Sequence, residues 1–149
     1  MRVGGIDPGK KGFLCVLQDD DDPIFYSLPY DQEGILNISI FEAAILPLDV
    51  VFVERPIGVN SDGLMMRHQD FGEMRGIIRK HCEFRWLMPK VWKDALGLTK
   101  DKHLSILKAK ALYPNADLRR MTPTGQVSQI PDDNRAEALL IAHYGKSVL

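Results

Sequence analysis

The chain has 149 residues, 45% of them hydrophobic and 26% charged, with a formal net charge of -1. This length suits one domain with a sizeable core and is short for two, so we expect a single domain over residues 1–149. No apolar run approaches the roughly 18 to 20 residues that span a bilayer, and the start of the chain lacks a signal-peptide pattern. Cys15 and Cys82 stand far apart in apolar surroundings, which predicts reduced thiols and a cytoplasmic location.

The first half of the chain predicts four strands and a helix. Strands over residues 2–7 and 12–18 flank "DPGKKG", whose Pro-Gly is turn chemistry. "DDDDP" (19–23) is an exposed loop, and a calcium site there lacks the EF-hand spacing. "IFYSLP" predicts a third strand, residues 35–46 predict a helix, and "DVVFVERP" is typical of a central strand covered on both sides.

The second half predicts one further strand and four helices. "NSDGLMMRHQDFGEMRGIIRKHC" has helical spacing, and we expect Gly72 and Gly76 to permit the close approach of a neighbouring element. "FRWLMP" predicts a strand, and helices begin at Pro89 and Asp101. Residues 115–131 predict a long loop, and "DDNRAEALLIAHYG" predicts a closing helix with aspartate caps. This order predicts an α/β fold: a mixed five-stranded sheet with helices on both faces.

Charge is unevenly distributed along the chain. Residues 1–66 hold 4 Lys and Arg against 11 Asp and Glu, whereas residues 67–110 hold 11 against 5. Two interpretations of this basic middle third are equally open: a face that binds a polyanion, or solvated helix surfaces.

Carboxylates follow the predicted core strands at the points where those strands end. Asp7 and Glu54 both close apolar strands, and neighbouring parallel strands would bring them to one edge of the sheet, where open α/β sheets bind ligands. On the last helix, Asp133 and Glu137 share a face at i and i+4, Asn134 and Glu137 are neighbours at i and i+3, and Asp132 points away. The alternatives are a turn-initiating Asp7, helix-capping aspartates and a surface Glu137.

Clustered carboxylates are costly unless a cation joins them. All-oxygen ligands suit Mg²⁺ or Mn²⁺, and two such ions roughly 3.5 to 4 Å apart serve in-line phosphoryl transfer. The predicted metal ligands are Asp7, Glu54, Asp133 and Glu137, with Asp132 as a further candidate. No organic cofactor is expected.

Three segments, "GIDPG", "VFVERP" and "DDNRAEALLIAHYG", together resemble the RuvC-type Holliday junction resolvases, which are crossover junction endodeoxyribonucleases of the ribonuclease H-like superfamily. "QDFGEMRGII", "PKVWKDALGLTKDKH" and "ALYP" resemble the middle section of that family, so the likeness covers nearly the whole chain. The compact length suggests a phage-like, divergent branch.

The resemblance implies a homodimeric, metal-dependent endonuclease that cuts four-way DNA junctions symmetrically in a bacterial or phage-infected cell. Asp7 and Glu54 match the first two catalytic acids, and Glu137 matches the last. The family often has an acid or His three residues before the last acid, where this chain has Asn134. Asp133 is therefore the better candidate for the fourth catalytic acid, with Asp132 behind it.

The resemblance also supports a catalytic lysine, Lys102, which would neutralise the scissile phosphate, with Lys100 as a substitute. Lys10 and Lys11 lie in the turn beside Asp7, where they are expected to contact DNA. The basic middle supplies further candidate phosphate contacts, namely Arg67, Arg75, Arg79, Lys80, Lys90, Lys93, Lys108 and Lys110.

Other features have structural or assembly interpretations. The loop over residues 57–66 is expected to enter the junction centre, although Ile57 stands where the family often has an aromatic residue. The helix around residues 65–80 is the candidate dimer interface. Trp86 and Trp92 are expected in the core, and the four histidines show no metal-ligand spacing.

Three alternatives stay open at this point. The same fold and chemistry can act on other branched DNA or on RNA–DNA hybrids. A junction-binding protein that has lost catalysis is suggested only by Asn134. The sugar kinase and actin fold also begins with a similar strand and turn, but it needs two such domains.

Overall fold

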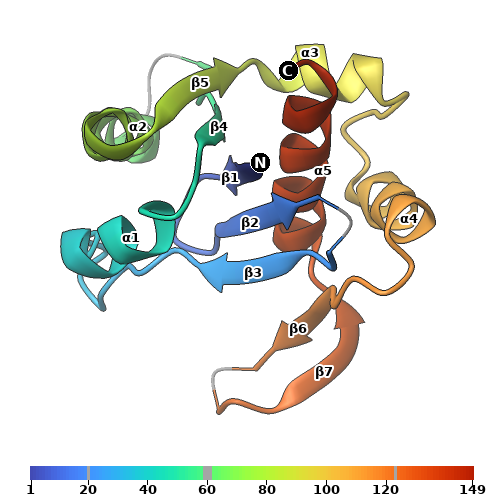
Figure 1. Ribbon diagram of the computed structural model, residues 1–149. Helices are drawn as coiled ribbons and strands as arrows, with labels where there is room; N and C mark the ends of the chain where they lie inside the picture. Colours follow the sequence, from blue (N-terminus) through green and yellow to red (C-terminus); the bar gives the residue numbers. More distant parts are fainter. Residues whose placement is uncertain (20, 59–61, 123) are drawn as a thin grey trace.

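A computed structural model describes residues 1–19, 21–58, 62–122 and 124–149, without the side chains of 62–64. Its centre is a five-stranded sheet in the order β3-β2-β1-β4-β5 (Figure 1). The strands are β1 (Arg2–Asp7), β2 (Phe13–Gln18), β3 (Ile24–Ser27), β4 (Val50–Glu54) and β5 (Glu83–Leu87). The first three strands pair antiparallel, whereas β1–β4 and β4–β5 pair parallel. The predicted mixed sheet is confirmed.

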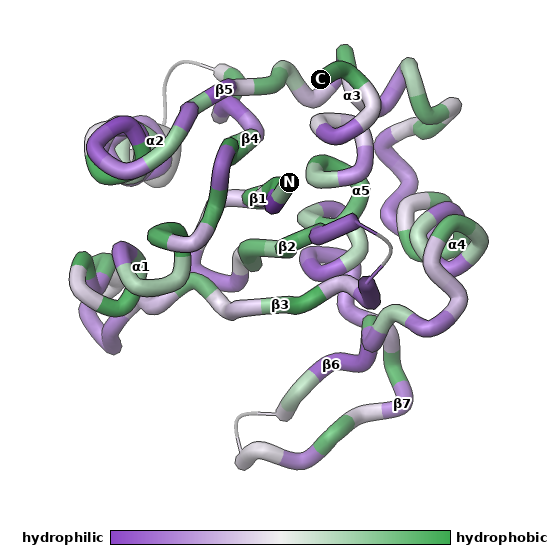
Figure 2. The backbone as a smooth tube through the Cα atoms, viewed as in Figure 1, coloured by the Kyte–Doolittle hydropathy of each residue, from purple (hydrophilic) through white to green (hydrophobic). Residues whose placement is uncertain are grey.

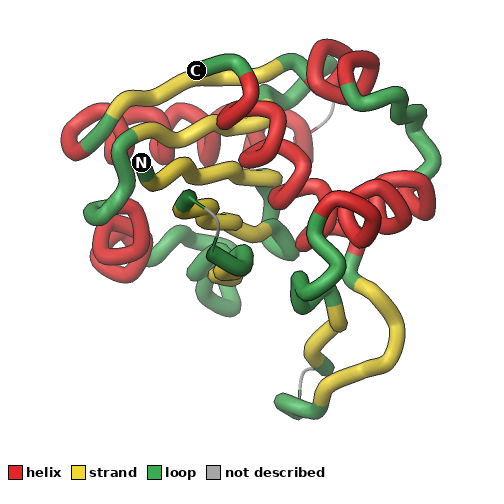
Figure 3. Tube along the Cα trace, turned by 45° about the vertical axis from the view of Figure 1, so that its right-hand side comes forward, coloured by secondary structure: helices red, strands yellow, loops and turns green. Residues whose placement is uncertain are grey.

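Helices cover both faces of this sheet. Helices α1 (Ile38–Ile45) and α2 (Asp62–His81) lie on one face, and α3 (Pro89–Ala95), α4 (Lys102–Leu112) and α5 (Asp133–Ser147) lie on the other (Figures 1 and 3). Because side chains alternate along a strand, β1 supplies Val3 to the core under α5 and Ile6 to the core under α1 and α2. Figure 2 shows hydrophobic residues along β2 and β4 at the centre, with a largely hydrophilic α2 outside.

The pairing of β1 with β4 brings two of the predicted acids to one edge. Ile6 lies beside Val53 in this parallel register, so Asp7 and Glu54 are the next residues on their strands. The first four residues of β4 are buried, as expected for a central strand covered on both faces.

Helix α5 lies against β1 with almost no space between the two backbones. A Cβ added to Gly5 would collide with the backbone of Ala138 and Ala142, and one added to Gly145 would collide with the ring of Phe52. The small residues on both elements therefore permit this close approach, and the helix is fully buried from residue 138 to 142.

Several sequence expectations differ from the structure. The predicted loop over 115–131 contains an antiparallel hairpin, β6 (Arg119–Met121) and β7 (Val127–Pro131), which extends away from the rest of the molecule (Figures 1 and 3). Its strands are short and mostly exposed, so they lack the alternation that marks a strand in a sequence. The turn between the two strands has two stabilising features. The backbone N–H of Gln126 donates a hydrogen bond to the Thr122 hydroxyl, and Gly125 adopts a positive φ of 81°.

The structure also differs from the expectations for the glycines of α2 and for Trp86. A Cβ added to Gly72 or Gly76 would have no neighbouring element within 4 Å in the described part of the chain, so these glycines permit no close packing there. Trp92 is in the core as expected, but Trp86 is 49% exposed and lies against the Arg55 guanidinium.

Cys15 and Cys82 are free thiols. In the described parts of the chain, no helix has the length and apolar character needed to cross a membrane.

Gly5→Ala is expected to lower the free energy of unfolding by about 3 kcal/mol, because the added methyl group pushes α5 away from β1. Gly76→Ala is the matched control, and it is expected to raise that free energy by roughly 0.5–1 kcal/mol, since it replaces an open glycine within a helix. Urea denaturation at one pH measures both. A similar effect of the two changes would contradict the close packing of α5 on β1.

Candidate active site

A cavity of about 560 Å³ lies where β1 and β4 end, and three predicted acids line it. Asp7 comes from the end of β1, Glu54 from the end of β4 and Glu137 from the first turns of α5. Asn134 lines the cavity one helical turn before Glu137. Elements far apart in the sequence therefore bring three carboxylates and one amide to a single hollow, which we call the acidic cavity.

Burial and mutual repulsion act on the carboxylates of β1 and β4. Asp7 is only 8% exposed, and its burial, followed by the charges of Glu137 and Glu54, raises its pKa well above the usual value. Burial also raises the pKa of Glu54, although the hydrogen bond from Trp92 opposes this rise. The site thus concentrates negative charge that the protein alone does not fully compensate.

Side chains from α3 and α4 hold two of the acids in place. The Trp92 indole Nε1 donates a hydrogen bond to Glu54 at 2.7 Å, and the Lys93 ammonium donates one to Glu137 at 2.9 Å. The buried Ser105 hydroxyl donates a longer bond of 3.4 Å to Glu137. Lys93, predicted as a surface DNA contact, is 19% exposed and serves inside the site as the counter-charge of Glu137. Sequence reasoning missed these roles of Trp92 and Lys93.

The two aspartates at the start of α5 lie at a neighbouring hollow of about 600 Å³, which we call the flanking cavity. Asp132 is the N-cap of the helix, and its carboxylate accepts a hydrogen bond from the backbone N–H of Asn134 at 2.9 Å. Asp133 accepts from the Lys102 ammonium at 2.6 Å. Burial acts to raise the pKa of Asp133, but the hydrogen bond and charge of Lys102 lower it overall.

This arrangement changes the order of the candidates for the fourth ligand. Asn134 lines both cavities, whereas Asp132 and Asp133 line only the flanking cavity. Helix periodicity placed Asp133 on the face of Glu137, but the ion pair with Lys102 turns its carboxylate toward α4. The neutral Asn134 is therefore the side chain that accompanies Asp7, Glu54 and Glu137.

Within the ranges that the structure describes, no three His, Cys, Asp or Glu side chains are grouped closely enough to hold a metal ion. Glu54 instead accepts a hydrogen bond from Trp92, and Glu137 accepts one from Lys93. The donor set nevertheless fits Mg²⁺ or Mn²⁺, because all of its oxygen donors line one cavity. Burial, followed by the charges of Glu137 and Glu54, raises the pKa of Asp7, and a divalent cation would stabilise the ionised carboxylate against both effects.

The candidate DNA contacts divide into two groups. One group borders the acids: Lys10, Lys11 and Lys102 line both cavities, and Arg67 lines the acidic cavity. The others lie elsewhere, with Arg75, Arg79 and Lys80 on α2, Lys90 on α3, Lys100 before α4, and Lys108 and Lys110 on α4. Lys80 pairs with Glu42, and Lys90 pairs with Asp94. Because α2 and α4 cover opposite faces of the sheet, the basic middle does not form one continuous surface (Figure 1).

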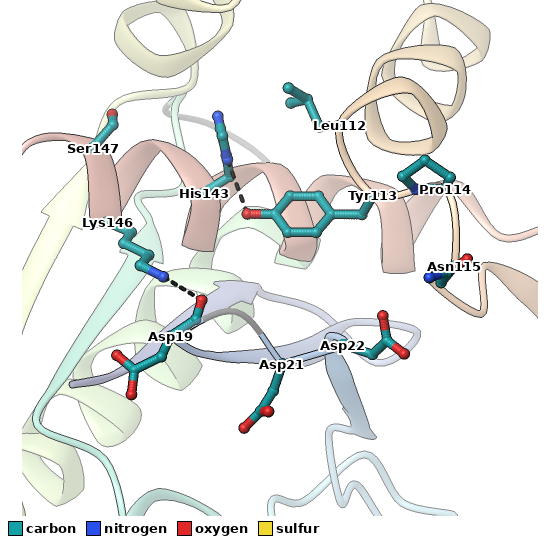
Figure 4. A pocket seen from close by; sticks show the side chains of 10 residues that line it. All are labelled: Asp19, Asp21, Asp22, Leu112, Tyr113, Pro114, Asn115, His143, Lys146 and Ser147. Carbon is teal, nitrogen blue, oxygen red and sulfur yellow. Dashed lines mark hydrogen bonds between the residues drawn. The ribbon is translucent and has the colours of Figure 1, made fainter.

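A third hollow, of about 460 Å³, lies at the opposite end of α5 and includes residues of the "DDDDP" loop (Figure 4). The carboxylates of Asp19, Asp21 and Asp22 point in different directions, and residue 20 lies outside the described ranges. His143 is bonded to the Tyr113 hydroxyl at 3.0 Å. These described side chains do not form a cation site.

The strand order and the helices on both faces of the sheet give an α/β fold that is similar to the fold of RuvC structures. Two structures of Thermus thermophilus RuvC, one of them in complex with a Holliday junction substrate, match the chain with a TM-score of 0.62. The identities are 15% and 16%, and each match covers 99% of this chain and 96% of the other. No protein-family model matches the sequence. No curated protein matches it significantly.

Asp7→Asn is expected to raise the melting temperature of the metal-free protein at pH 7 by at least about 3 °C, the equivalent of about 1 kcal/mol for a chain of this size. Because the pKa of Asp7 is raised on folding, its ionisation costs stability as the pH rises above the usual value of 3.8. The gain should therefore shrink between pH 7 and about pH 4.5. Thermal melts by circular dichroism measure it.

The control for this change is Asp94→Asn, which alters an exposed acid on α3 and should change stability by less than about 0.5 kcal/mol. Millimolar Mg²⁺ should raise the melting temperature of the wild type and leave that of Asp7→Asn unchanged. A lower melting temperature for Asp7→Asn at pH 7 would contradict the buried, uncompensated carboxylate.

Proposed function

We propose that the protein is a metal-dependent endonuclease that resolves four-way DNA junctions by paired phosphodiester hydrolysis. One observation carries the proposal: Asp7, Glu54 and Glu137 line one cavity that Lys10 and Lys11 also border. The fold supports it, because it resembles that of Thermus thermophilus RuvC, whose structure with a Holliday junction substrate is known.

Asp7, Glu54 and Glu137, together with the amide oxygen of Asn134, would hold two Mg²⁺ or Mn²⁺ ions. Bound in such a site, divalent cations lower the pKa of an attacking water and stabilise the leaving oxygen of a phosphodiester. The strand ends fix Asp7 and Glu54 on rigid elements, while Trp92 and Lys93 orient Glu54 and Glu137. These hydrogen bonds keep both carboxylates at the acidic cavity, and a metal ion would have to draw them closer together.

Lys102 is the candidate for orienting the scissile phosphate. It lines both cavities, and its side chain is 64% exposed although its ammonium bonds to Asp133. The hydrogen bond to Asp133 raises the pKa of Lys102, so the ammonium stays charged at neutral pH. A charged donor at the border of the acids can attract a phosphate and stabilise the charge that develops on it.

Further parts of the proposal concern assembly and origin. We place residues 1–149 in a single nuclease domain of a phage-like RuvC branch that acts in the cytoplasm. Helix α2 is the proposed homodimer interface, since Met65 and Met66 are exposed on it. The proposed junction-entering loop over 57–66 includes an exposed Ile57, but residues 59–61 and the side chains of 62–64 lie outside the described part.

The test compares a synthetic immobile four-way junction with a linear duplex, a fork and an RNA–DNA hybrid, each with Mg²⁺ or Mn²⁺. Wild type is expected to make paired nicks in the junction. Asp7→Asn should cut at least about 10³-fold more slowly while still binding, because it loses a metal ligand. Asp94→Asn is the control and should cut like the wild type.

Other outcomes separate the alternatives. Preferred cutting of the hybrid or the fork would assign the same chemistry to a different substrate. Binding of the junction without cutting in either metal would contradict the nuclease proposal. It would favour a junction-binding protein in which the neutral Asn134 has replaced a required acid.

A further inference from the structure

The flanking cavity has a cationic lining next to the acidic cavity. Its walls come from the turn after β1, the start of α4, the start of α5 and the hairpin strand β6. Lys10, Lys11 and Lys102 line both cavities, and Arg120 lines only the flanking one. The two hollows therefore share a border, and a polymer chain in one can continue into the other.

The charges in this lining favour a polyanion. Four cationic side chains face the flanking cavity against two acidic ones, Asp132 and Asp133. Asp132 is occupied as the N-cap of α5, and Asp133 lies between Lys102 and Arg120. Lys10 and Lys11 are exposed in the turn after β1 and line the same cavity. Several cations in one lining suit the repeated phosphates of a nucleic-acid strand better than a single small anion.

Arg120 is loosely held in its present position. Its guanidinium lies 3.6 Å from Asp133, beyond hydrogen-bond distance, and its side chain is 49% exposed. The neighbouring Arg119 is held firmly, with two hydrogen bonds to Asp117 at 2.8 and 3.1 Å. Arg119 lines a separate hollow with Asp117 and Lys110. Arg120 can therefore leave Asp133 for a phosphate oxygen without breaking a hydrogen bond, whereas Arg119 would have to break two hydrogen bonds to Asp117.

The hairpin also presents apolar side chains where a strand would leave the cavity. Met121 follows Arg120, lines the flanking cavity and is 59% exposed. It pairs with the exposed Val127 across the hairpin. Apolar side chains beside cationic ones suit a nucleic-acid strand, which offers sugars and base faces as well as phosphates.

We propose that the flanking cavity holds the sugar–phosphate backbone of the cleaved DNA strand beside the scissile phosphate, and that Arg120 binds a phosphate there. This inference rests on the proposed nuclease function and assigns the β6–β7 hairpin to substrate binding. A contact between the Arg120 guanidinium and a phosphate would fix the position of the DNA strand and would not depend on the base sequence.

The first test measures binding of a four-way junction by fluorescence anisotropy in the Asp7→Asn background, which prevents cutting. Adding Arg120→Gln should weaken binding about tenfold near 0.1 M salt and reduce the slope of log K against log salt by about one, since one phosphate contact is lost. Arg119→Gln should change neither quantity, and Arg120→Lys should restore the slope. Thermal melts confirm that the exposed changes leave folding intact.

The second test locates the phosphate. Single methylphosphonates replace one phosphate at a time along the cleaved strand. At one position beside the scissile phosphate, the methylphosphonate should weaken binding about tenfold in the protein that has Arg120. In Arg120→Gln the same methylphosphonate should cause no further loss of affinity, because both changes remove the same contact. Additive losses at every position would overturn the inference.

The results also separate this inference from the function on which it rests. A wild type that neither binds nor cuts any branched DNA overturns both. A wild type that cuts the junction, with Arg120→Gln equal to Arg119→Gln in affinity and salt slope, overturns the role of Arg120 alone.

Discussion

The contact between the backbones of α5 and β1 determines where the three carboxylates of the acidic cavity meet. Gly5 leaves room for the turn of α5 that contains Ala138 and Ala142. Asp7 stands two residues beyond Gly5 and therefore faces the same side of the sheet. Glu137 directly precedes Ala138, so the close approach brings its carboxylate to the end of β1. A larger side chain at residue 5 would separate the two acids as well as the two elements.

The second constraint is electrostatic. Burial of Asp7, followed by the charges of Glu137 and Glu54, raises the pKa of Asp7, so its ionisation at neutral pH opposes folding. The chain offsets part of it with Lys93 on Glu137 and an indole donor, Trp92, on Glu54. Because these partners are drawn from α3, that short helix is part of the site although it contributes no acid. A loss of stability of this kind is expected wherever a protein keeps several acids together without a bound cation.

The elements that could be predicted from the sequence carry strong local signals. The buried run of β4 and the turn after Asp7 indicated a sheet edge with two acids, and the register of β1 and β4 agrees. The β6–β7 hairpin was missed because its short, exposed strands have no apolar alternation. The orientation of Asp133 and the roles of Trp92 and Lys93 depend on packing between helices, which periodicity within one helix does not contain. Only the adjacency of an indole donor and a lysine in "PKVWKDALG" hinted at that support.

We propose that Asp7, Glu54 and Glu137 form one cation-binding site, and anomalous X-ray diffraction from crystals of the wild type soaked in Mn²⁺ tests this most directly. Anomalous density is expected in the acidic cavity, at about 2 Å from carboxylate oxygens of at least two of these residues. Density elsewhere, or none with Glu137 still bonded to Lys93, would contradict it.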